Sequence, residues 1–178
     1  METAAAATAE LKLNLGCGNK HLQGFVNVDL ESNWCLRKPN MAADVAKPLP
    51  LPDGVVDEVH AYHLVEHFYR WEAFDILADW VRVLKPGGLL VIELPCLDKI
   101  LSIMQHCIAT QTEMPENLTM WGLYGDPGYG KPEMCHRWCY SIAEMTAMLE
   151  ELGLEVTSTE PQTHKPIRDM RLEGRKCL

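Results

Sequence analysis

The chain has 178 residues, of which 47% are hydrophobic and 23% are charged, and its formal net charge is −9. This length allows one domain with a full core, and the composition is that of an ordinary globular protein. Phosphate binding needs many cations, so the acidic charge disfavours a nucleic-acid surface. No apolar run approaches the roughly 20 residues of a membrane helix, so we expect no membrane partner.

The N-terminus and the cysteines indicate in which compartment the protein lies. The first ten residues lack the basic and apolar regions of a secretory signal, and we expect a disordered lead-in over 1–10 and a single domain over 11–178. The seven cysteines are an odd number without CxxC spacing, which indicates reduced thiols and a cytoplasmic location. Cys135 and Cys139 flank His136, but no second pair follows at finger spacing, so we predict no metal site.

The first motif is a glycine turn between two short strands. An apolar strand over 13–15 runs into Gly16-Cys17-Gly18, and a second strand over 25–28 ends at Asp29. Two glycines directly after a strand allow a sharp turn and a close approach of the backbone to a ligand. A carboxylate at the tip of the next strand can accept hydrogen bonds from both hydroxyls of a ribose. The stretch therefore predicts a site for an adenosyl cofactor.

The spacing within this motif separates it from a nicotinamide-type site. Such a site would have a third glycine near position 21 and an acid about 20 residues downstream. This chain has His21 instead, and Asp29 follows Gly18 by only 11 residues. A diphosphate on a long helix is therefore disfavoured, and the first helix should be abbreviated.

Two further strands should continue the sheet. The third ends at Asp44, and the three prolines between residues 48 and 52 forbid a helix directly after it. The fourth is the β-branched run over 55–61, which suits a central parallel strand. Ligands in open α/β sheets lie outside the carboxyl ends of the strands, so the residues that follow should border the site. These are Tyr62, His63, Glu66 and His67.

The clearest helix is predicted over 71–84, where apolar residues recur at three- and four-residue spacing. The sequence KPGG at 85–88 ends it, and the continuous apolar run over 89–95 predicts a strand buried on both faces. A second helix is expected over 96–107.

Periodicity is lost over 110–140, a segment rich in Gly, Pro and aromatic residues. Long irregular segments in compact domains are often functional, so we expect a lid that covers the substrate. Ser141 and Glu144 form a capping box that opens a third helix, which Gly153 ends. Two strands near 154–158 and 167–173 should close the chain.

These features resemble the class I S-adenosylmethionine-dependent methyltransferases over nearly the whole chain. The resemblance rests on the glycine turn, on the acid that ends the second strand, on Val65-Glu66-His67 and on the helix, PGG turn and strand of 71–95. Together with the alternation of strands and helices, it implies an α/β, Rossmann-like, doubly wound sheet that is mostly parallel with an antiparallel C-terminal strand.

The resemblance also implies S-adenosyl-L-methionine as the cofactor and assigns its contacts. The family usually has an acid two residues before the first glycine, where this chain has the uncharged Asn14 to accept from the cofactor's ammonium group. In the family an acid at the position of Asp44 recognises the adenine amino group. The cofactor-binding residues are expected to be Asn14, Gly16, Cys17, Gly18, Asp29, Leu30, Asp44, Val45, Tyr62 and His63.

The sulfonium methyl group is already activated, so its transfer needs mainly alignment of donor and acceptor. A base is required only where the acceptor must lose a proton. His63 and His136 are the candidate catalytic residues, whereas Glu66 and His67 are expected to hold each other or the neighbouring helix in place.

Three functions remain open. The favoured one is methyl transfer to a small molecule, and the HRW sequence at 136–138 and the R-D-x-R sequence at 168–171 resemble members that act on sugar, polysaccharide or lipid precursors. The second is a non-catalytic subunit that binds S-adenosylmethionine or S-adenosylhomocysteine, which Asn14 would favour. The third is an aminopropyl transferase, which would need an acidic pair where only Glu66 stands. Methylation of nucleic-acid bases is disfavoured because no Asn-Pro-Pro-Tyr-type turn follows residue 61.

Overall fold

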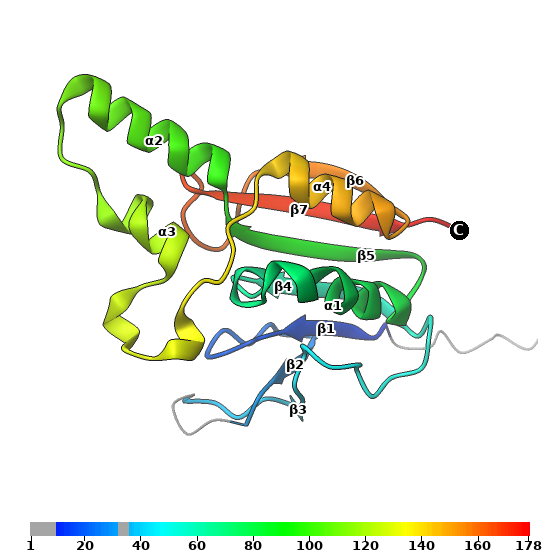
Figure 1. The fold of residues 1–178 in the computed structure, drawn as a ribbon. Coiled ribbons are helices and arrows are strands. Elements are labelled where there is room, and N and C mark those ends of the chain that lie inside the picture. Colours follow the sequence, from blue (N-terminus) through cyan, green and yellow to red (C-terminus); the bar gives the residue numbers. More distant parts are fainter. Residues whose placement is uncertain (1–9, 32–35) are drawn as a thin grey trace, which may run out of the picture.

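The computed structural model describes residues 10–31 and 36–178. The expected lead-in over 1–10 lies outside the described residues except for Glu10. The described chain forms one seven-stranded sheet in the order β3-β2-β1-β4-β5-β7-β6 (Figure 1). The strands are β1 (Lys12–Leu15), β2 (Val26–Asp29), β3 (Met41–Ala42), β4 (Val56–Tyr62), β5 (Leu84–Pro95), β6 (Leu154–Thr159) and β7 (Asp169–Lys176).

Strand directions confirm the predicted fold class. Strands β1 to β5 pair in parallel, whereas β7 pairs antiparallel with both β5 and β6. The centre of the sheet is apolar because β4 and β5 place the fully buried Val59, Ala61, Leu90 and Ile92 on one face, while Val91, also fully buried, points to the other face. This packing holds the carboxyl ends of β1, β4 and β5 at one edge.

Four α-helices are described: α1 (Arg70–Val83), α2 (Leu97–Thr110), α3 (Met120–Tyr124) and α4 (Ile142–Glu151). Helices α1 and α4 lie across one face of the sheet, while α2 projects away from it (Figure 1). The periodicity of 71–84 placed α1 to within one residue, because its apolar face, including Leu77 and Trp80, is buried against the sheet. None of the helices in the described chain is both long and apolar enough to cross a bilayer.

The connection from β1 to β2 is abbreviated as predicted. Residues 16–25, all of which are described, contain no helix. Side-chain amides hold the connection in place: Asn14 Nδ2 donates to the Lys20 carbonyl and to Asn27 Oδ1, each at 2.8 Å, and Asn27 Nδ2 donates to Asn40 Oδ1 at 2.9 Å. This partly buried amide network holds the connection where the fold has no first helix.

Some local expectations were wrong. Strand β3 covers only 41–42, so Asp44 lies two residues beyond it rather than at its end. The capping box before α4 is half formed: Ser141 Oγ accepts from Glu144 N at 3.0 Å, but the Glu144 carboxylate pairs with Arg70 Nε at 2.6 Å. A long-range cation thus draws the acid away from the helix end.

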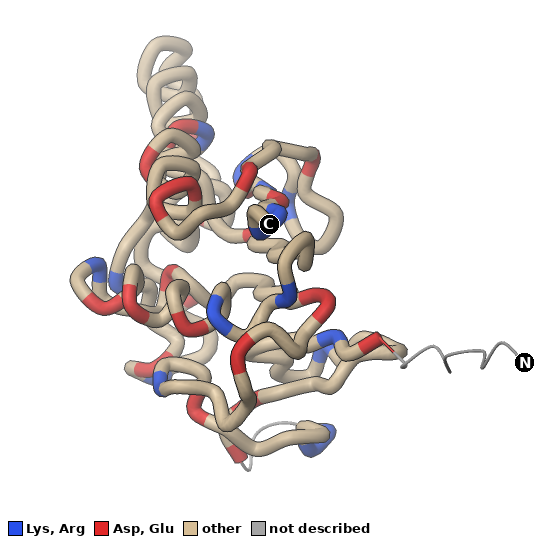
Figure 2. Tube along the Cα trace, turned by 90° about the vertical axis from the view of Figure 1, so that its right-hand side faces the viewer, with Lys and Arg blue, Asp and Glu red and all other residues tan. Residues whose placement is uncertain are grey.

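Residues 111–140 contain short helical turns rather than open coil. Besides α3, they hold η2 (Glu116–Leu118), η3 (Pro127–Tyr129) and η4 (Pro132–Met134). The segment lies at the edge of the sheet where β4 and β5 end (Figure 1), and a bridge between Cys96 and Tyr140 closes it. Acidic and basic positions are interspersed along the chain rather than gathered into one basic stripe (Figure 2).

Candidate functional site

Two glycines with positive φ shape the corner after β1, and each has its own reason. Gly16 has φ +61°, and a Cβ there would lie 2.7 Å from Leu64 Cδ1. Gly18 has φ +48°, and no atom lies within 4 Å of the position of its Cβ. The first glycine is therefore required by packing against Leu64, whereas the second leaves an open approach for a ligand.

Asp29 fastens this corner to the tip of β2. Its Oδ2 accepts from Gly18 N at 2.6 Å and its Oδ1 accepts from Leu30 N at 2.7 Å. Each carboxylate oxygen keeps a further lone pair, so the group can still accept hydrogen bonds from a ligand. Leu30 follows with its side chain 56% exposed. The glycine corner, an acceptor and an exposed apolar surface thus adjoin one another.

Asn14 lies beneath the corner and is only 1% exposed. Both of its amide hydrogens are used, one by the Lys20 carbonyl and one by Asn27. Acceptance by its Oδ1 from the ammonium group of a cofactor stays a prediction.

Asp44 and Val45 lie after β3, beside α1. Asp44 Oδ1 accepts from Ala46 N at 3.1 Å, and Asp44 Oδ2 pairs with Lys47 Nζ at 3.2 Å. The Val45 carbonyl accepts from Trp80 Nε1 at 3.0 Å. Helix α1 thus fixes the backbone where the adenine contacts were predicted.

Tyr62 ends β4 next to the glycine corner. Its hydroxyl lies 2.7 Å from His60 Nδ1, and Lys20 Nζ lies 5.4 Å from the centre of its ring. Burial raises the pKa of the Tyr62 hydroxyl, so it stays neutral at physiological pH.

His63 has a backbone conformation that is uncommon outside glycine, with φ +49°. Its N–H donates to the Glu93 carbonyl at 2.7 Å. Its ring lies between two carboxylates, with Nε2 3.0 Å from Asp169 Oδ2 and Nδ1 3.0 Å from Glu66 Oε1. Strain of this kind is often found at functional sites, where surrounding contacts hold it.

The two carboxylates beside His63 set the charge of its ring. Burial alone would lower the pKa of His63, but Asp169 and Glu66 outweigh it and raise the pKa to about 9. Burial opposes ionisation of Glu66, yet His63 lowers the pKa of Glu66 to about 2. His63 is therefore a cation at neutral pH, which suits it to positioning and electrostatic roles. The role of His63 as a proton acceptor stays a prediction. In that role the cation would first have to lose one of its two ring protons.

His136, the other catalytic candidate, reaches the same carboxylate from far along the chain. Its Nδ1 lies 2.9 Å from the Gly122 carbonyl, and its Nε2 lies 4.0 Å from Glu66 Oε1. The Arg137 amide donates to the Glu66 carbonyl at 2.7 Å. Segment 136–137 thus packs against η1 (Val65–His67), which brings both His63 and His136 close to Glu66 Oε1. Among the described residues, Glu66, His67 and His136 have ligand atoms within 4.8 Å of one another, a group that could hold a metal.

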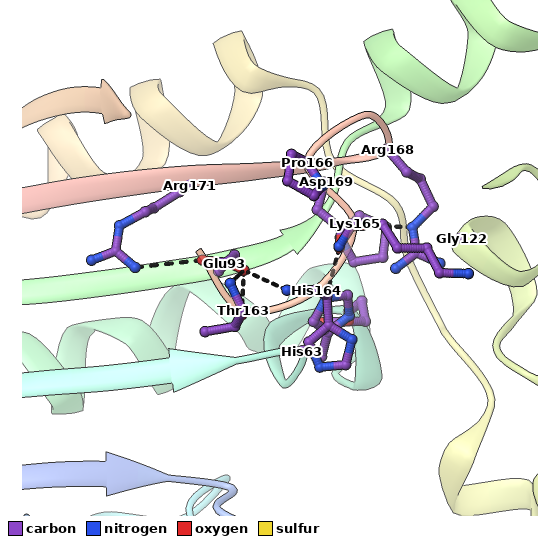
Figure 3. Close-up of polar contacts among 12 residues, drawn as sticks. His63, Glu93, Gly122, Thr163, His164, Lys165, Pro166, Arg168, Asp169 and Arg171 are labelled. Carbon is purple, nitrogen blue, oxygen red and sulfur yellow. Dashed lines mark hydrogen bonds and ion pairs between the residues drawn. The ribbon is translucent and has the colours of Figure 1, made fainter. Parts of the chain in front are cut away.

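Glu93 was not singled out from the sequence, and Asp169 was noted only as part of the R-D-x-R sequence, without a role beside His63. Glu93 is fully buried at the end of β5, and it accepts from the Thr163 hydroxyl, from Gln162 N at 2.9 Å and from Thr163 N at 2.7 Å. Arg171 Nη1 lies 3.4 Å from its Oε2 (Figure 3). The 160–168 loop is thereby fastened over the strand ends. The available signal was one acid inside the apolar run of 89–95.

Fastening the loop has a consequence for His63. It places the ring of His164 4.1 Å from that of His63 and lets Lys165 N donate to Asp169 Oδ2 at 3.0 Å (Figure 3). Arg168 Nε donates to Asp169 Oδ1 at 2.5 Å. Asp169 is thus held by three partners, His63, Arg168 and the Lys165 amide, and they keep its pKa well below its usual range despite burial.

A pocket of about 570 Å³ lies within the 110–140 segment. Its lining combines aromatic and charged side chains, including Trp121, Tyr124, Asp126 and Lys131. It abuts the site because His136 N donates to the Tyr124 carbonyl at 3.2 Å.

Part of the chain is similar in sequence to known methyltransferases. A family model described as a methyltransferase domain matches residues 13–92. A Mycolicibacterium smegmatis protein named "Probable S-adenosylmethionine-dependent methyltransferase" is 29% identical over 112 residues, which cover 62% of this chain and 33% of that protein. The chain therefore spans about a third of the length of that curated relative.

Solved structures share the fold. A Methanosarcina mazei S-adenosylmethionine-dependent methyltransferase has TM-score 0.64 and 16% identity, with 96% of this chain and 94% of that chain covered. One from Archaeoglobus fulgidus has TM-score 0.61 and 18% identity, with 94% and 86% covered. A chain from a Haloferax volcanii complex between the Trm112 methyltransferase activator and a methyltransferase has TM-score 0.59 and 15% identity, with 96% and 84% covered.

Proposed function

We propose that this chain, which belongs to the class I S-adenosylmethionine-dependent methyltransferases, transfers the methyl group of S-adenosylmethionine to a small-molecule acceptor. Sugar, polysaccharide or lipid precursors are the acceptor classes that its HRW and R-D-x-R sequences favour. The observation that carries the proposal is the hydrogen bond from Gly18 N to Asp29, which joins the glycine corner to the carboxylate at the tip of β2.

Each predicted cofactor contact has a place in this proposal. The open side of Gly18 and the exposed Leu30 would face the nucleoside, while Asp29 accepts hydrogen bonds from the ribose. Asp44 and the Val45 amide would read the adenine. The carbonyl oxygen of Asn14 would accept from the cofactor's ammonium group. The complete set is Asn14, Gly16, Cys17, Gly18, Asp29, Leu30, Asp44, Val45, Tyr62 and His63.

The chemical step would depend chiefly on alignment, because the methyl carbon of the sulfonium is already electrophilic. The His63 cation lies at the tip of β4, held by Asp169 and Glu66. It would orient an acceptor that carries oxygen or negative charge. His136 would approach the acceptor from the 110–140 segment, which we propose acts as the lid.

We also propose that the enzyme is cytoplasmic. No disulfide joins the six cysteines of the described residues to one another. Reduced cysteines persist in reducing compartments, which supports a cytoplasmic enzyme.

The cofactor site can be tested by titration calorimetry with S-adenosylmethionine and S-adenosylhomocysteine. Hydrogen bonds to a charged group contribute about 1.5–3 kcal/mol, so Asp29→Ala should weaken binding about 10- to 100-fold. Asp44→Ala, which leaves the glycine corner intact, should weaken binding by a smaller factor. Asp75→Ala on the exposed face of α1 is the matched control and should bind as the wild type does. Absence of binding to either ligand by the wild type would refute the proposal.

A non-catalytic cofactor-binding subunit is the second candidate. The observation in its favour is Asn14, an uncharged residue already engaged by Lys20 and Asn27. A screen of donor-radiolabelled methyl transfer across sugar, lipid and catechol acceptors separates the two. Label in any acceptor supports the enzyme, whereas tight cofactor binding without transfer to any acceptor class supports the subunit.

A further inference from the structure

We propose that Glu66, His67 and His136 bind one divalent transition-metal ion, with Zn²⁺ as the first candidate. The three residues come from two segments about 70 positions apart, η1 and the stretch after η4. Their ligand atoms lie within 4.8 Å of one another. Two imidazoles and one carboxylate are a donor set that zinc uses where it keeps an open coordination position.

The first line of support is a buried carboxylate with unused acceptors. The Glu66 side chain is only 1% exposed. One of its two carboxylate oxygens, Oε2, has no hydrogen-bond partner among the described residues. Oε1 lies 3.0 Å from His63 Nδ1 as an ion pair, and Oε2 is without even that contact in the described chain. Buried polar atoms without partners cost free energy, and a cation beside Oε2 would remove that cost.

The second line of support comes from the two histidines. His67 Nδ1 is also buried without a hydrogen-bond partner among the described residues. The ring of His136 lies 5.0 Å from the ring of His67 and nearly perpendicular to it, at 89°. The two rings therefore lie side by side, with a ligand atom of each within 4.8 Å of the other and of a Glu66 oxygen.

The backbone orients His136 for this role. Because the Gly122 carbonyl is an acceptor, the hydrogen bond at 2.9 Å places the proton of neutral His136 on Nδ1. The lone pair of Nε2 then faces Glu66, from which it is 4.0 Å away. Metal-binding histidines usually donate their other ring N–H to a carbonyl or a carboxylate in this manner.

The site differs from the one that the sequence suggested and set aside. Cys135 and Cys139 flank His136, but the thiol of Cys135 is exposed and 4.0 Å from the Lys131 carbonyl, and that of Cys139 is 4.0 Å from the Pro95 carbonyl. The folded chain supplies Glu66 and His67 instead. Sequence spacing could not reveal this, because η1 and segment 136–137 meet only in the tertiary structure.

Binding would have two consequences. The ion would cross-link the 110–140 segment to the end of β4, next to His63. Three protein ligands would leave at least one position for water or for an acceptor oxygen. The use of that position for catalysis rests on the proposed methyl transfer, whereas binding of the ion does not.

Cobalt substitution of the full chain tests the site. Protein freed of metal by a chelator is titrated with Co²⁺, whose visible absorption reports four- or five-coordinate binding, and Zn²⁺ is then added. We expect one Co²⁺ per chain, displaced by Zn²⁺. Loss of outer partners of a metal site already costs about 10- to 100-fold in affinity, so His67→Gln and His136→Gln should each lose at least about tenfold. His106→Gln, on the exposed face of α2, is the matched control and should bind as the wild type does.

The outcomes separate cleanly. Absence of the visible bands in the wild type, or wild-type affinity in His136→Gln, overturns the proposal. A thiolate-to-cobalt charge-transfer band that disappears in Cys135→Ser/Cys139→Ser also overturns it, because the cysteines would then be the ligands. Circular dichroism of each variant distinguishes ligand loss from unfolding. Calorimetry with S-adenosylmethionine on the same samples keeps the two proposals apart: one Co²⁺ bound to a chain that ignores the cofactor supports the metal site while refuting the proposed function.

Discussion

The two sides of the candidate site are built in different ways. The cofactor side, β1 to β3, consists of contacts between residues close in sequence, such as Gly18 with Asp29 and Asn14 with Asn27. The opposite side joins residues far apart: His63 with Asp169, Glu66 with Arg137, and Glu93 with Thr163. A short motif can encode the first side by itself, whereas the second exists only once the sheet has formed.

This difference separates the expected effects of mutation. On the far side, one buried carboxylate often fixes a whole segment, so a substitution there should cost stability. On the near side, the turn already has its shape from local contacts, so a substitution should act on ligand binding as much as on folding. The predictions below test that division.

Loss of the Glu93 charge should have the largest effect. Glu93→Gln removes the charged acceptor for the amides of Gln162 and Thr163 and leaves Arg171 without that partner. Disrupting a buried, hydrogen-bonded charge costs about 3–5 kcal/mol, so the free energy of unfolding should fall by about 3 kcal/mol. Urea denaturation measures the change.

Glu155→Gln is the control for this variant, because Glu155 is an exposed residue on β6. It should change the free energy of unfolding by less than about 0.5 kcal/mol. Equal losses in the two variants would show that the 160–168 loop is not held through Glu93.

The two glycines of the corner should respond differently to the same change. Both have positive φ, so Gly16→Ala and Gly18→Ala should each lose about 1–2 kcal/mol from backbone strain. Gly16→Ala should lose about 1 kcal/mol more, because its methyl group would displace Leu64 Cδ1, 2.7 Å away. Gly18→Ala adds no contact within the protein but would narrow the ligand approach.

Urea denaturation and cofactor calorimetry on both variants make this comparison. We expect Gly16→Ala to be the less stable protein and Gly18→Ala to show the greater loss of cofactor affinity per unit of stability lost. A reversed order would mean that Gly18, not Gly16, is confined by the fold.

The sequence predicted those parts of the fold and site that depend on residues close together in the chain. Helix α1 and strands β1, β2, β4 and β5 were predicted because their apolar patterns are local. Asp44 was misplaced by two residues because a two-residue strand leaves almost no pattern. Helix α3 was not predicted, because its Gly122 packs against Ile100 of helix α2 and this contact exists only in the folded chain. The role of Glu93 could not be predicted, because the loop that it binds lies about 70 residues further along the chain.

Acid titration gives the smallest effect and addresses the same carboxylate. Burial would raise the pKa of Glu93, but the amides of Gln162 and Thr163, the Thr163 hydroxyl and Arg171 outweigh it and lower the pKa below 4.5. A carboxyl whose pKa is lower in the folded than in the unfolded protein contributes stability above the unfolded value, and this contribution is lost as the pH falls through the folded value. Wild type should therefore lose stability below pH 4.5 more steeply than Glu93→Gln.

The two proteins share every other titrating group, including Glu66 and Asp169, so the difference between their stability curves isolates Glu93. Urea denaturation at a series of acid pH values measures both curves. Parallel curves would mean that the loop contacts do not depend on the charge of Glu93. Curves that converge as the pH falls would show that the charge itself fastens the 160–168 loop beside His63, through contacts that no local motif encodes.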